Sequence, residues 1–187
     1  MMQLERLRSS LASSTVMKRG SYDYFVNPIT DGVPWVDPEI LREVLTALRE
    51  IGNFDCDMVV APEAMGIPLA VPLSIECGIP YTVVRKKKYG LPGEVAVTQI
   101  TGYSKSEMYI NGVGEGDRVT LVDSVISSGG TMRAILGGLR SVGAEIVDLL
   151  VVVEKGSGKK AIEEEFGVRI KTLLSIRVAD GAVKIIG

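Results

Sequence analysis

The stretch RVTLVDSVISSGGTMRAI, residues 118–135, joins a run of apolar residues to a loop of glycines and hydroxyl-bearing residues. Residues 118–123 have the length and composition of a buried strand ending in Asp123, and residues 131–143 have the apolar spacing of a helix ending at Gly143. Glycines let successive backbone N–H groups point into one concavity, and the start of a helix adds positive potential. The loop is therefore predicted to hold a phosphate group through Ser127, Ser128, Gly129, Gly130 and Thr131.

This loop differs from the phosphate loops of nucleotide-hydrolysing proteins. It does not carry the GxxxxGK[ST] pattern, so it has no lysine to reach a β- or γ-phosphate. A phosphate monoester is the better fit, and Asp123 at the strand end is placed to accept hydrogen bonds from sugar hydroxyls. The alternative interpretation is an ordinary strand–helix turn capped by serine and threonine.

Predicted strands and helices alternate through most of the chain. The clearest helix, residues 37–51, has Asp37 at its N-cap, Pro38 at its first position and Gly52 at its end. Further helices are predicted at 65–80, 131–143 and 159–167, and strands at 57–62, 81–86, 118–123, 145–154, 169–178 and 182–186. This alternation predicts an α/β fold with a mostly parallel central sheet flanked by helices. Ligands bind such sheets at the carboxyl ends of the strands.

Composition sets limits on the class of protein. The 187 residues suit one domain, residues 1–187, and the net charge of −2 argues against nucleic acid as a partner. No apolar run approaches ~20 residues and the N-terminus is charged, so neither a membrane partner nor a secretory signal is expected and the cytoplasm is the expected location. Histidine is absent, which excludes Ser-His-Asp and Cys-His catalysis.

Two other strand ends carry unusual residues. PEAMG, residues 62–66, follows one predicted strand, and the basic run Arg85–Lys88 follows the next. A basic run at a strand end in an acidic protein is a local anion site, although solvated basic runs are common on surfaces. Residues 86–117 are weakly patterned, and the pieces VAVTQI and EMYI indicate a loop or hairpin flap rather than core.

Residues 118–131 resemble the phosphoribosyl-pyrophosphate (PRPP) motif of the type I phosphoribosyltransferases, and the expected fold is that family's. The resemblance implies that Ser127 to Thr131 hold the 5′-phosphate of PRPP, and that Asp123 and Ser124 hold the ribose hydroxyls. The family has an acidic residue where this chain has Ser124. A neutral hydrogen bond is weaker than a charged one, so PRPP binding is expected to be about tenfold weaker.

The segments PEAMG and RKKKYGLPGE resemble those of adenine phosphoribosyltransferases. The resemblance implies a pyrophosphate site built from Glu63, Ala64, Met65, Gly66, Arg85, Lys86, Lys87 and Lys88. It also implies Mg²⁺, held by Asp123 and PRPP, and a flexible lid over about residues 86–108, which keeps water from the reacting ribose. The arginine of the family's loop is Met65 here.

Nearly the whole chain is similar to the archaeal purine phosphoribosyltransferases that carry the label hypoxanthine/guanine phosphoribosyltransferase. The resemblance implies a homodimer, and a small hood built mainly from residues 1–36. Residues expected to contact the purine base are Tyr22, Tyr24, Phe25 and Val125. Glu94 is the candidate general base, and Lys155 is either a donor to a 6-oxo group or a surface lysine.

The resemblance predicts transfer of ribose 5-phosphate from PRPP to hypoxanthine or guanine, with release of pyrophosphate. The lid motif favours adenine instead, so the choice of purine stays open. Better-known hypoxanthine/guanine enzymes carry an aspartate, a candidate general base, where this chain has Ser127. This absence and Ser124 also fit a non-catalytic protein that senses PRPP or purines. A different phosphate-ester binder on a doubly wound sheet is a further alternative.

Overall fold

The structure of the chain, a computed structural model, describes residues 4–20, 22–100 and 105–187. Its helices are α1 (Glu5–Ala12), α2 (Pro38–Ile51), α3 (Ile67–Cys77), α4 (Gly130–Ser141) and α5 (Gly158–Phe166). Its strands are β1 (Val16–Arg19), β2 (Tyr22–Phe25), β3 (Met58–Pro62), β4 (Tyr81–Val84), β5 (Val95–Ile100), β6 (Lys105–Ile110), β7 (Arg118–Ile126), β8 (Glu145–Lys155), β9 (Lys171–Ala179) and β10 (Ala182–Ile185). The α/β alternation predicted from the sequence is confirmed.

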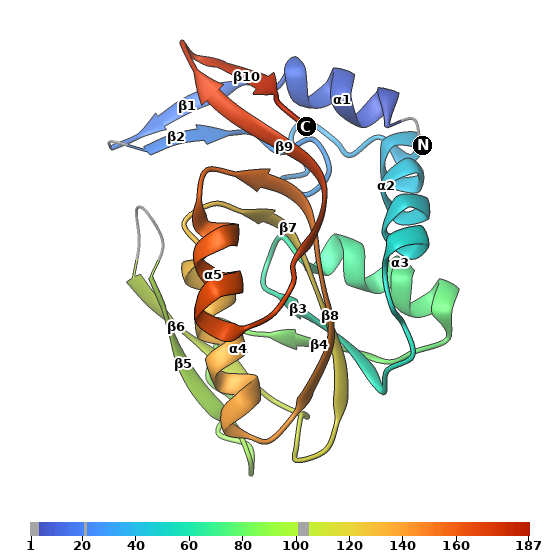
Figure 1. The fold of residues 1–187 in the computed structure, drawn as a ribbon, viewed down its shortest axis with the longest axis vertical. Helices are drawn as coiled ribbons and strands as arrows, with labels where there is room; N and C mark the ends of the chain where they lie inside the picture. The colour runs from blue at the N-terminus through green and yellow to red at the C-terminus, as the bar shows by residue number, and fades with distance from the viewer. Residues whose placement is uncertain (1–3, 21, 101–104) are drawn as a thin grey trace.

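A six-stranded sheet in the order β10-β9-β8-β7-β3-β4 forms the centre of the molecule (Figure 1). Strands β4, β3, β7, β8 and β9 run parallel, and β10 joins the edge antiparallel to β9. The chain passes outward from β3 to β4 on one side, and outward from β7 through β8 to β9 on the other. The boundary between β3 and β7 is therefore the topological switch point of the sheet, where open α/β sheets bind their ligands.

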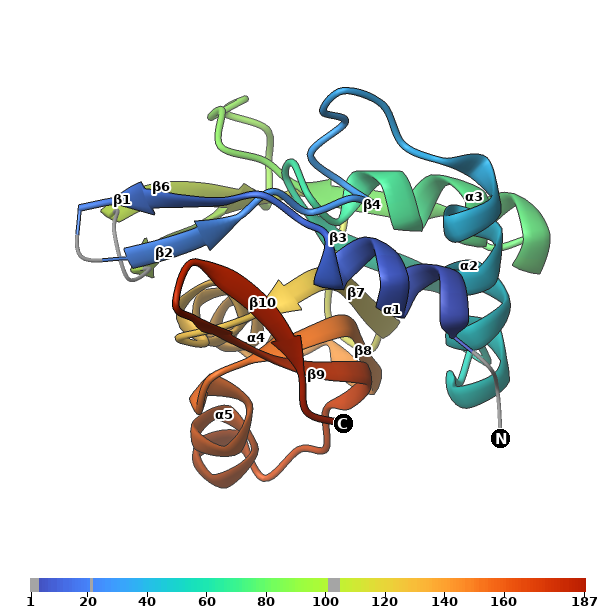
Figure 2. The ribbon, with the colours of Figure 1, turned by 90° about the horizontal axis from the view of Figure 1, so that it is seen from above.

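Helices cover both faces of the sheet, as Figures 1 and 2 show. One face packs Val122 and Leu150 against α2 and α3 in one buried apolar cluster. The other face packs Leu121 and Val151 against α4 and α5 in a second cluster. Neighbouring residues of a strand point to opposite faces of the sheet. The central strands β7 and β8 are therefore apolar on both faces, and each appears in the sequence as a continuous apolar run.

Local signals explain where the elements begin and end. The Asp37 side chain accepts a hydrogen bond of 2.8 Å from the Glu39 N–H, which caps α2 as its sequence predicts. Helix α3 ends at Gly78, whose φ of 68° is left-handed. Strand β7 continues to Ile126, beyond the predicted end at Asp123. Ser124 therefore belongs to the strand and not to the loop.

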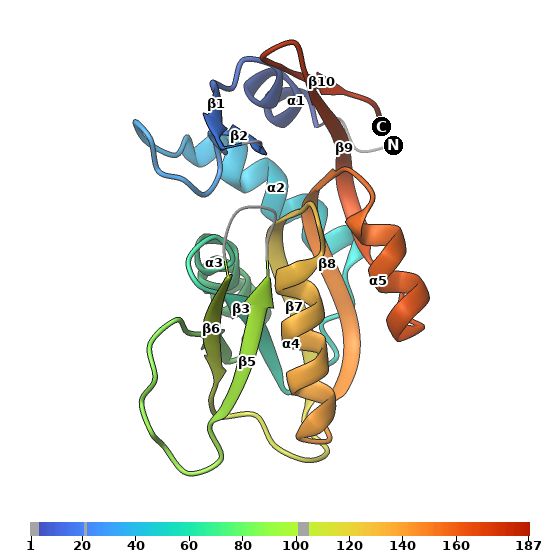
Figure 3. The same ribbon diagram turned by 90° about the vertical axis from the view of Figure 1, so that its left-hand side faces the viewer.

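The β5–β6 hairpin packs beside α4 (Figure 3). Met108 and Ile110 of β6 are buried in the same cluster as α4, so the expectation of a flap outside the core is wrong for this strand. The reason is Gly138 of α4, where an added Cβ would lie 2.6 Å from the side chains of Val97 and Ile110. Residues 101–104 of the predicted lid lie outside the described residues.

A small layer stands above the carboxyl ends of the sheet (Figure 1). It contains α1 and the antiparallel pair β1–β2, from the segment predicted to form the hood, and β10 packs against α1. Leu7 and Leu11 of α1 are fully buried, and Glu43 of α2 accepts a hydrogen bond of 2.8 Å from the Leu7 N–H. Among the described helices, none is long and apolar enough to span a membrane.

Candidate functional site

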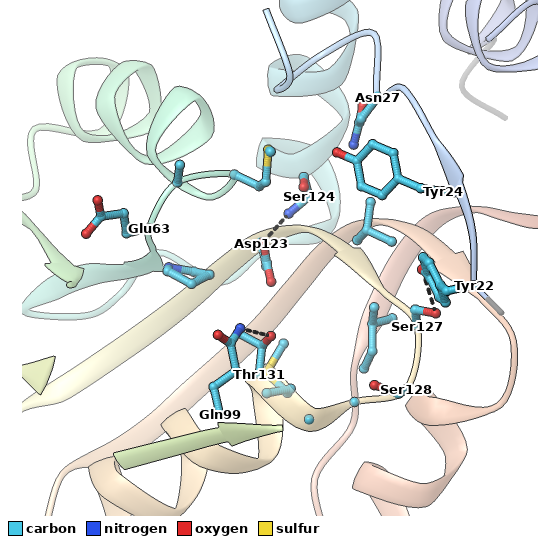
Figure 4. Close-up of a pocket in the computed structure, with 18 of the residues that line it drawn as sticks. Tyr22, Tyr24, Asn27, Glu63, Gln99, Asp123, Ser124, Ser127, Ser128 and Thr131 are labelled. Atoms are coloured by element: carbon cyan, nitrogen blue, oxygen red, sulfur yellow. Dashed lines mark hydrogen bonds between the residues drawn. The ribbon is translucent and has the colours of Figure 1, made fainter. Parts of the chain in front are cut away.

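A cavity of about 230 Å³ lies at the switch point, between the ends of β3 and β7 and beneath β2 (Figure 4). All residues predicted for the 5′-phosphate, the ribose and the purine line it, namely Ser127, Ser128, Gly129, Gly130, Thr131, Asp123, Ser124, Tyr22, Tyr24, Phe25 and Val125. Because these residues come from distant parts of the chain, the fold brings the sequence-predicted groups together at one place.

The loop after β7 has a fixed shape. Gly129 has a φ of 80°, which an L-residue rarely adopts, and an added Cβ there would lie 2.8 Å from Ile162 of α5. The Gly158 N–H at the start of α5 donates a hydrogen bond of 3.0 Å to the Ser127 carbonyl. Helix α4 begins at Gly130, directly after this loop, so the backbone N–H groups of its first turn are directed towards the cavity. The arrangement suits a bound anion.

Asp123 and Ser124 share the end of β7 but point to opposite sides. Figure 4 shows the Asp123 carboxylate directed towards Thr131 and the Ser124 hydroxyl directed towards Asn27. Asp123 is buried, and burial raises its pKa from 3.8 to about 7, although the Ser124 N–H donates a hydrogen bond of 2.7 Å that opposes the rise. A carboxyl group with this pKa is poised between its two protonation states at neutral pH.

The end of β3 contributes a second wall. Of the loop predicted to hold pyrophosphate, Glu63, Ala64 and Met65 line the cavity, and Gly66 is not among the lining residues. An added Cβ at Gly66 would lie 2.9 Å from the Val122 carbonyl, so glycine allows this loop to approach β7.

Only one residue of the basic run Arg85–Lys88 lies at the wall of the cavity. Lys86 lines the cavity, but Arg85, Lys87 and Lys88 are not among the residues that line it. The Lys86 N–H donates a hydrogen bond of 2.9 Å to Glu63, and the Arg85 Nε lies 3.6 Å from the same carboxylate. The run therefore ties the end of β4 to the loop after β3.

The hood segment closes the cavity from above. The Tyr22 hydroxyl donates a hydrogen bond of 3.2 Å to the Ser127 Oγ, so the hood contacts the predicted phosphate loop directly. The Tyr24 hydroxyl donates to both carboxylate oxygens of Asp31, at 2.6 and 2.8 Å. Phe25 is buried and offers only its ring.

Asn27 is a pocket residue that sequence reasoning missed. Its side chain is 3% exposed, and its Oδ1 accepts a hydrogen bond of 3.1 Å from the Ile29 N–H. That bond fixes which end of the amide is oxygen. The Nδ2 is buried and has no hydrogen-bond partner among the described residues, and Figure 4 shows it at the cavity end of the side chain. Asparagine before proline is a common turn signal, so the sequence held no mark of this role.

Gln99 of β5 is the second pocket residue that was missed. It lies in the segment predicted to be a lid, yet its side chain is 8% exposed and lines the cavity. Its Nε2 donates a hydrogen bond of 2.6 Å to the Thr131 Oγ1. Strand alternation placed it on the inner face, but the hairpin's packing partner could not be read from the sequence.

Glu94 is not placed to act as the general base in this structure. It does not line the cavity, and its carboxylate accepts hydrogen bonds from the N–H groups of Tyr89 and Gly90 and from the Asn111 amide, at 2.8–3.0 Å. Burial would raise the pKa of Glu94, but the Asn111 and backbone hydrogen bonds outweigh it and lower the pKa. Glu94 therefore orders the turn that precedes β5.

Lys155 also serves a different contact from the one proposed for it. Its Nζ donates a hydrogen bond to the Asp23 carbonyl and lies 3.8 Å from the centre of the Tyr22 ring. It does not line the cavity. The Lys155 ammonium group therefore makes a cation–π contact with Tyr22, and this contact holds strand β2 of the hood over the end of β8.

The described residues contain no cluster of three or more His, Cys, Asp or Glu side chains that could hold a metal ion. The carboxylates that line the cavity are Asp123 and Glu63. Oxygen ligands of this kind fit Mg²⁺, which commonly takes one or two protein carboxylates and completes its shell with phosphate oxygens and water.

Residues 38–176 match the family model described as the phosphoribosyl transferase domain. The chain is 52% identical over 183 residues to a Methanobacterium lacus protein named hypoxanthine/guanine phosphoribosyltransferase, covering 98% of this chain and 96% of that protein. A Methanocaldococcus jannaschii protein of the same name is 51% identical over 181 residues, covering 96% and 99%. A solved adenine phosphoribosyltransferase from Thermoanaerobacter pseudethanolicus shares the fold, with a TM-score of 0.75 at 22% identity over 92% of this chain and 99% of that chain.

Proposed function

We propose that this chain, which belongs to the phosphoribosyl transferase domain family, transfers the 5-phosphoribosyl group of PRPP to hypoxanthine or guanine. The products are the nucleotides IMP or GMP and pyrophosphate, and the role is purine salvage. The membership confirms the resemblance drawn from residues 118–131. Relatives about half identical over nearly the whole chain, all named hypoxanthine/guanine phosphoribosyltransferase, support the choice of purine.

The observation that carries the choice of purine is the buried Asn27 amide nitrogen. It is a buried hydrogen-bond donor without a partner among the described residues. Asn27 lines the cavity, so a small shift of its side chain brings this donor to a bound base. The 6-oxo group of hypoxanthine and guanine is an acceptor, whereas the 6-amino group of adenine is a donor. A buried donor left unpaired costs about 1–3 kcal/mol, so this site favours a base that offers an acceptor.

The two ends of PRPP have matching partners. The loop from Ser127 to Thr131 binds the 5′-phosphate through backbone N–H groups and hydroxyls, and Asp123 accepts hydrogen bonds from the ribose. Tyr22 and Phe25 cover the base and keep water from the reaction centre. Catalysis then rests mainly on positioning and electrostatic stabilisation of the positive charge that develops at the ribose C1.

The leaving pyrophosphate faces the end of β3. The backbone N–H groups of Ala64 and Met65 and the Lys86 side chain supply its donors, since the Glu63 and Gly66 N–H groups already donate to the Val84 and Pro62 carbonyls. Arg85, Lys87 and Lys88 add positive potential nearby. Asp123 offers the oxygen ligand for Mg²⁺ carried by PRPP. When bound, Mg²⁺ neutralises charge on the pyrophosphate. The proposal also includes a homodimer in the cytoplasm, and light scattering of the purified chain tests the dimer.

The decisive experiment supplies Mg²⁺ and PRPP with hypoxanthine, guanine or adenine in separate reactions and follows nucleotide and pyrophosphate. Turnover with a 6-oxopurine is the expected result, and turnover with adenine alone would replace the proposal by adenine salvage. A parallel Ser124→Asp variant restores the acidic residue of the family motif. If neither protein forms nucleotide while PRPP still binds, the chain is a sensor of PRPP or purines and not an enzyme.

A further inference from the structure

A chain of hydrogen bonds runs from the β5–β6 hairpin into the phosphate loop. The Ser106 hydroxyl of β6 donates to the Gln99 Oε1 at 2.9 Å, and the Gln99 Nε2 donates to the Thr131 Oγ1 at 2.6 Å (Figure 4 shows the second bond). Ser106 and Gln99 are direct partners across the hairpin. The chain therefore crosses from one strand to the next and ends at the first turn of α4.

The direction of this chain is set by the groups in it. An amide nitrogen can only donate, so the Thr131 oxygen must accept from Gln99. A hydroxyl has a single proton, and the Thr131 hydroxyl donates no hydrogen bond to another described residue. Thr131 lines the cavity, so its proton is free to point at an anion held by the loop. Every donor in the chain faces the same way.

We infer that Gln99 is a positioning residue for the 5′-phosphate, acting through the Thr131 hydroxyl; the inference rests on the proposed function of the loop. Donors aligned in series polarise one another, and the last bond of the series is strengthened by the negative charge of the phosphate. Gln99 thus turns the Thr131 hydroxyl into a dedicated donor before the substrate arrives. It also joins the hairpin to the loop proposed to hold the phosphate.

Packing alone does not explain a glutamine at this position. Val95 and Val97, the other inward-facing residues of β5, are apolar and pack against the cluster that contains α4. An amide buried beside them costs free energy unless both of its ends are hydrogen-bonded. Here Ser106 and Thr131 satisfy the two ends, and only the second of these partners belongs to the substrate cavity.

The test is a double-mutant cycle on the full chain, read as the affinity for ribose 5-phosphate by calorimetry. Gln99→Met keeps the apolar volume but removes both hydrogen bonds, and Thr131→Val removes the hydroxyl. Each single variant is expected to weaken binding about 5- to 20-fold, because each loses a donor to a charged group or its support. In the Thr131→Val background, Gln99→Met should change the affinity less than twofold.

Two companion variants keep the result interpretable if Gln99→Met folds poorly. Gln99→Glu has nearly the same shape, but a carboxylate accepts the Thr131 proton and turns it away from the phosphate, so it should weaken binding more than Gln99→Met. Thr98→Val, on the exposed face of the same strand, is the matched control and should bind like the unchanged chain. Hypoxanthine affinity, measured without phosphate ester, should be the same in all variants.

Three results overturn the inference. Equal losses from Gln99→Met with and without Thr131 would assign it a packing role, and no loss in Gln99→Met or Gln99→Glu would assign it none. Failure of ribose 5-phosphate to bind the unchanged chain would also overturn it. The proposed function fails separately. If the effects of Gln99→Met and Thr131→Val depend on each other but no nucleotide forms, only the reaction is rejected. If nucleotide forms but the two effects simply add, only the role of Gln99 is rejected.

Discussion

The Tyr22 hydroxyl donates a hydrogen bond to the Ser127 Oγ at 3.2 Å, which joins the hood to the loop predicted to hold phosphate. The two residues are 105 positions apart in the sequence. The same ring lies against Lys155, so one tyrosine connects β2, the loop after β7 and the end of β8. If the loop holds a phosphate ester and the hood covers the base as proposed, we expect the two events to be linked through this side chain.

Tyr22→Phe keeps the ring and the cation–π contact but removes the hydroxyl. A neutral hydrogen bond contributes about 1 kcal/mol, so KM for PRPP should rise about fivefold while kcat changes little. Steady-state kinetics with hypoxanthine held at saturation measure this. A fall in kcat with unchanged KM would show that the hydroxyl acts on the reacting centre instead of the phosphate loop.

Asn27→Asp should change the choice of purine. The aspartate keeps an acceptor for the Ile29 N–H but replaces the buried donor by a second acceptor. The kcat/KM for hypoxanthine should fall about 10- to 100-fold, and the value for adenine should fall less or rise, because only the 6-oxo group loses its partner. Equal losses for the two bases would mean that Asn27 only shapes the cavity.

Asp123 should make the free protein less stable as the pH rises. Burial raises its pKa from 3.8 to about 7, so the folded state keeps a proton that the unfolded state has already released. The stability from this group is complete below about pH 4 and is lost through about pH 7. Asp123→Asn should remove that loss and be more stable than the unchanged chain at about pH 8.

Urea unfolding at about pH 4 and about pH 8 checks the effect of Asp123. The two proteins should differ in free energy of unfolding at the higher pH and agree at the lower one. An equal difference at both pH values would show that the asparagine acts through packing. PRPP should stabilise the unchanged chain more than the variant, since the asparagine carries no charge for Mg²⁺ or the ribose.

Gly158→Ala should disturb the phosphate loop although Gly158 lies outside the cavity. An added Cβ would lie 2.2 Å from the Ser127 carbonyl, so the loop or α5 must move. Stability should fall by about 1–3 kcal/mol, and PRPP affinity should fall with it. Gly137→Ala on the exposed side of α4 meets nothing within 4 Å and is the matched control, with an expected gain of about 0.5–1 kcal/mol. Thermal unfolding and PRPP titration of both variants measure this.

Features that depend on neighbouring residues could be predicted from the sequence. The cap at Asp37, the strand ending near Asp123 and the glycine loop before α4 are local, because turn chemistry and apolar spacing act over a few residues. Two walls of the cavity, the loop after β7 and the loop after β3, were predicted for a related reason, since parallel strands present their carboxyl ends at one edge of a sheet. The boundary of β7 was misplaced because its last residues, Val125 and Ile126, pair with Val153 and Glu154 of β8 in a way the sequence does not display.

The sequence by itself determined the fold class, the position of the glycine-rich loop before α4 and the family to which the chain belongs. Only the tertiary structure decided that Asn27 and Gln99 face the cavity, that Glu94 orders a turn and that Lys155 supports the hood. The physical reason is that a side chain's role depends on which hydrogen-bond partners and which empty space surround it. Those partners come from β2, β5 and the loop after β7, and only folding brings these segments together.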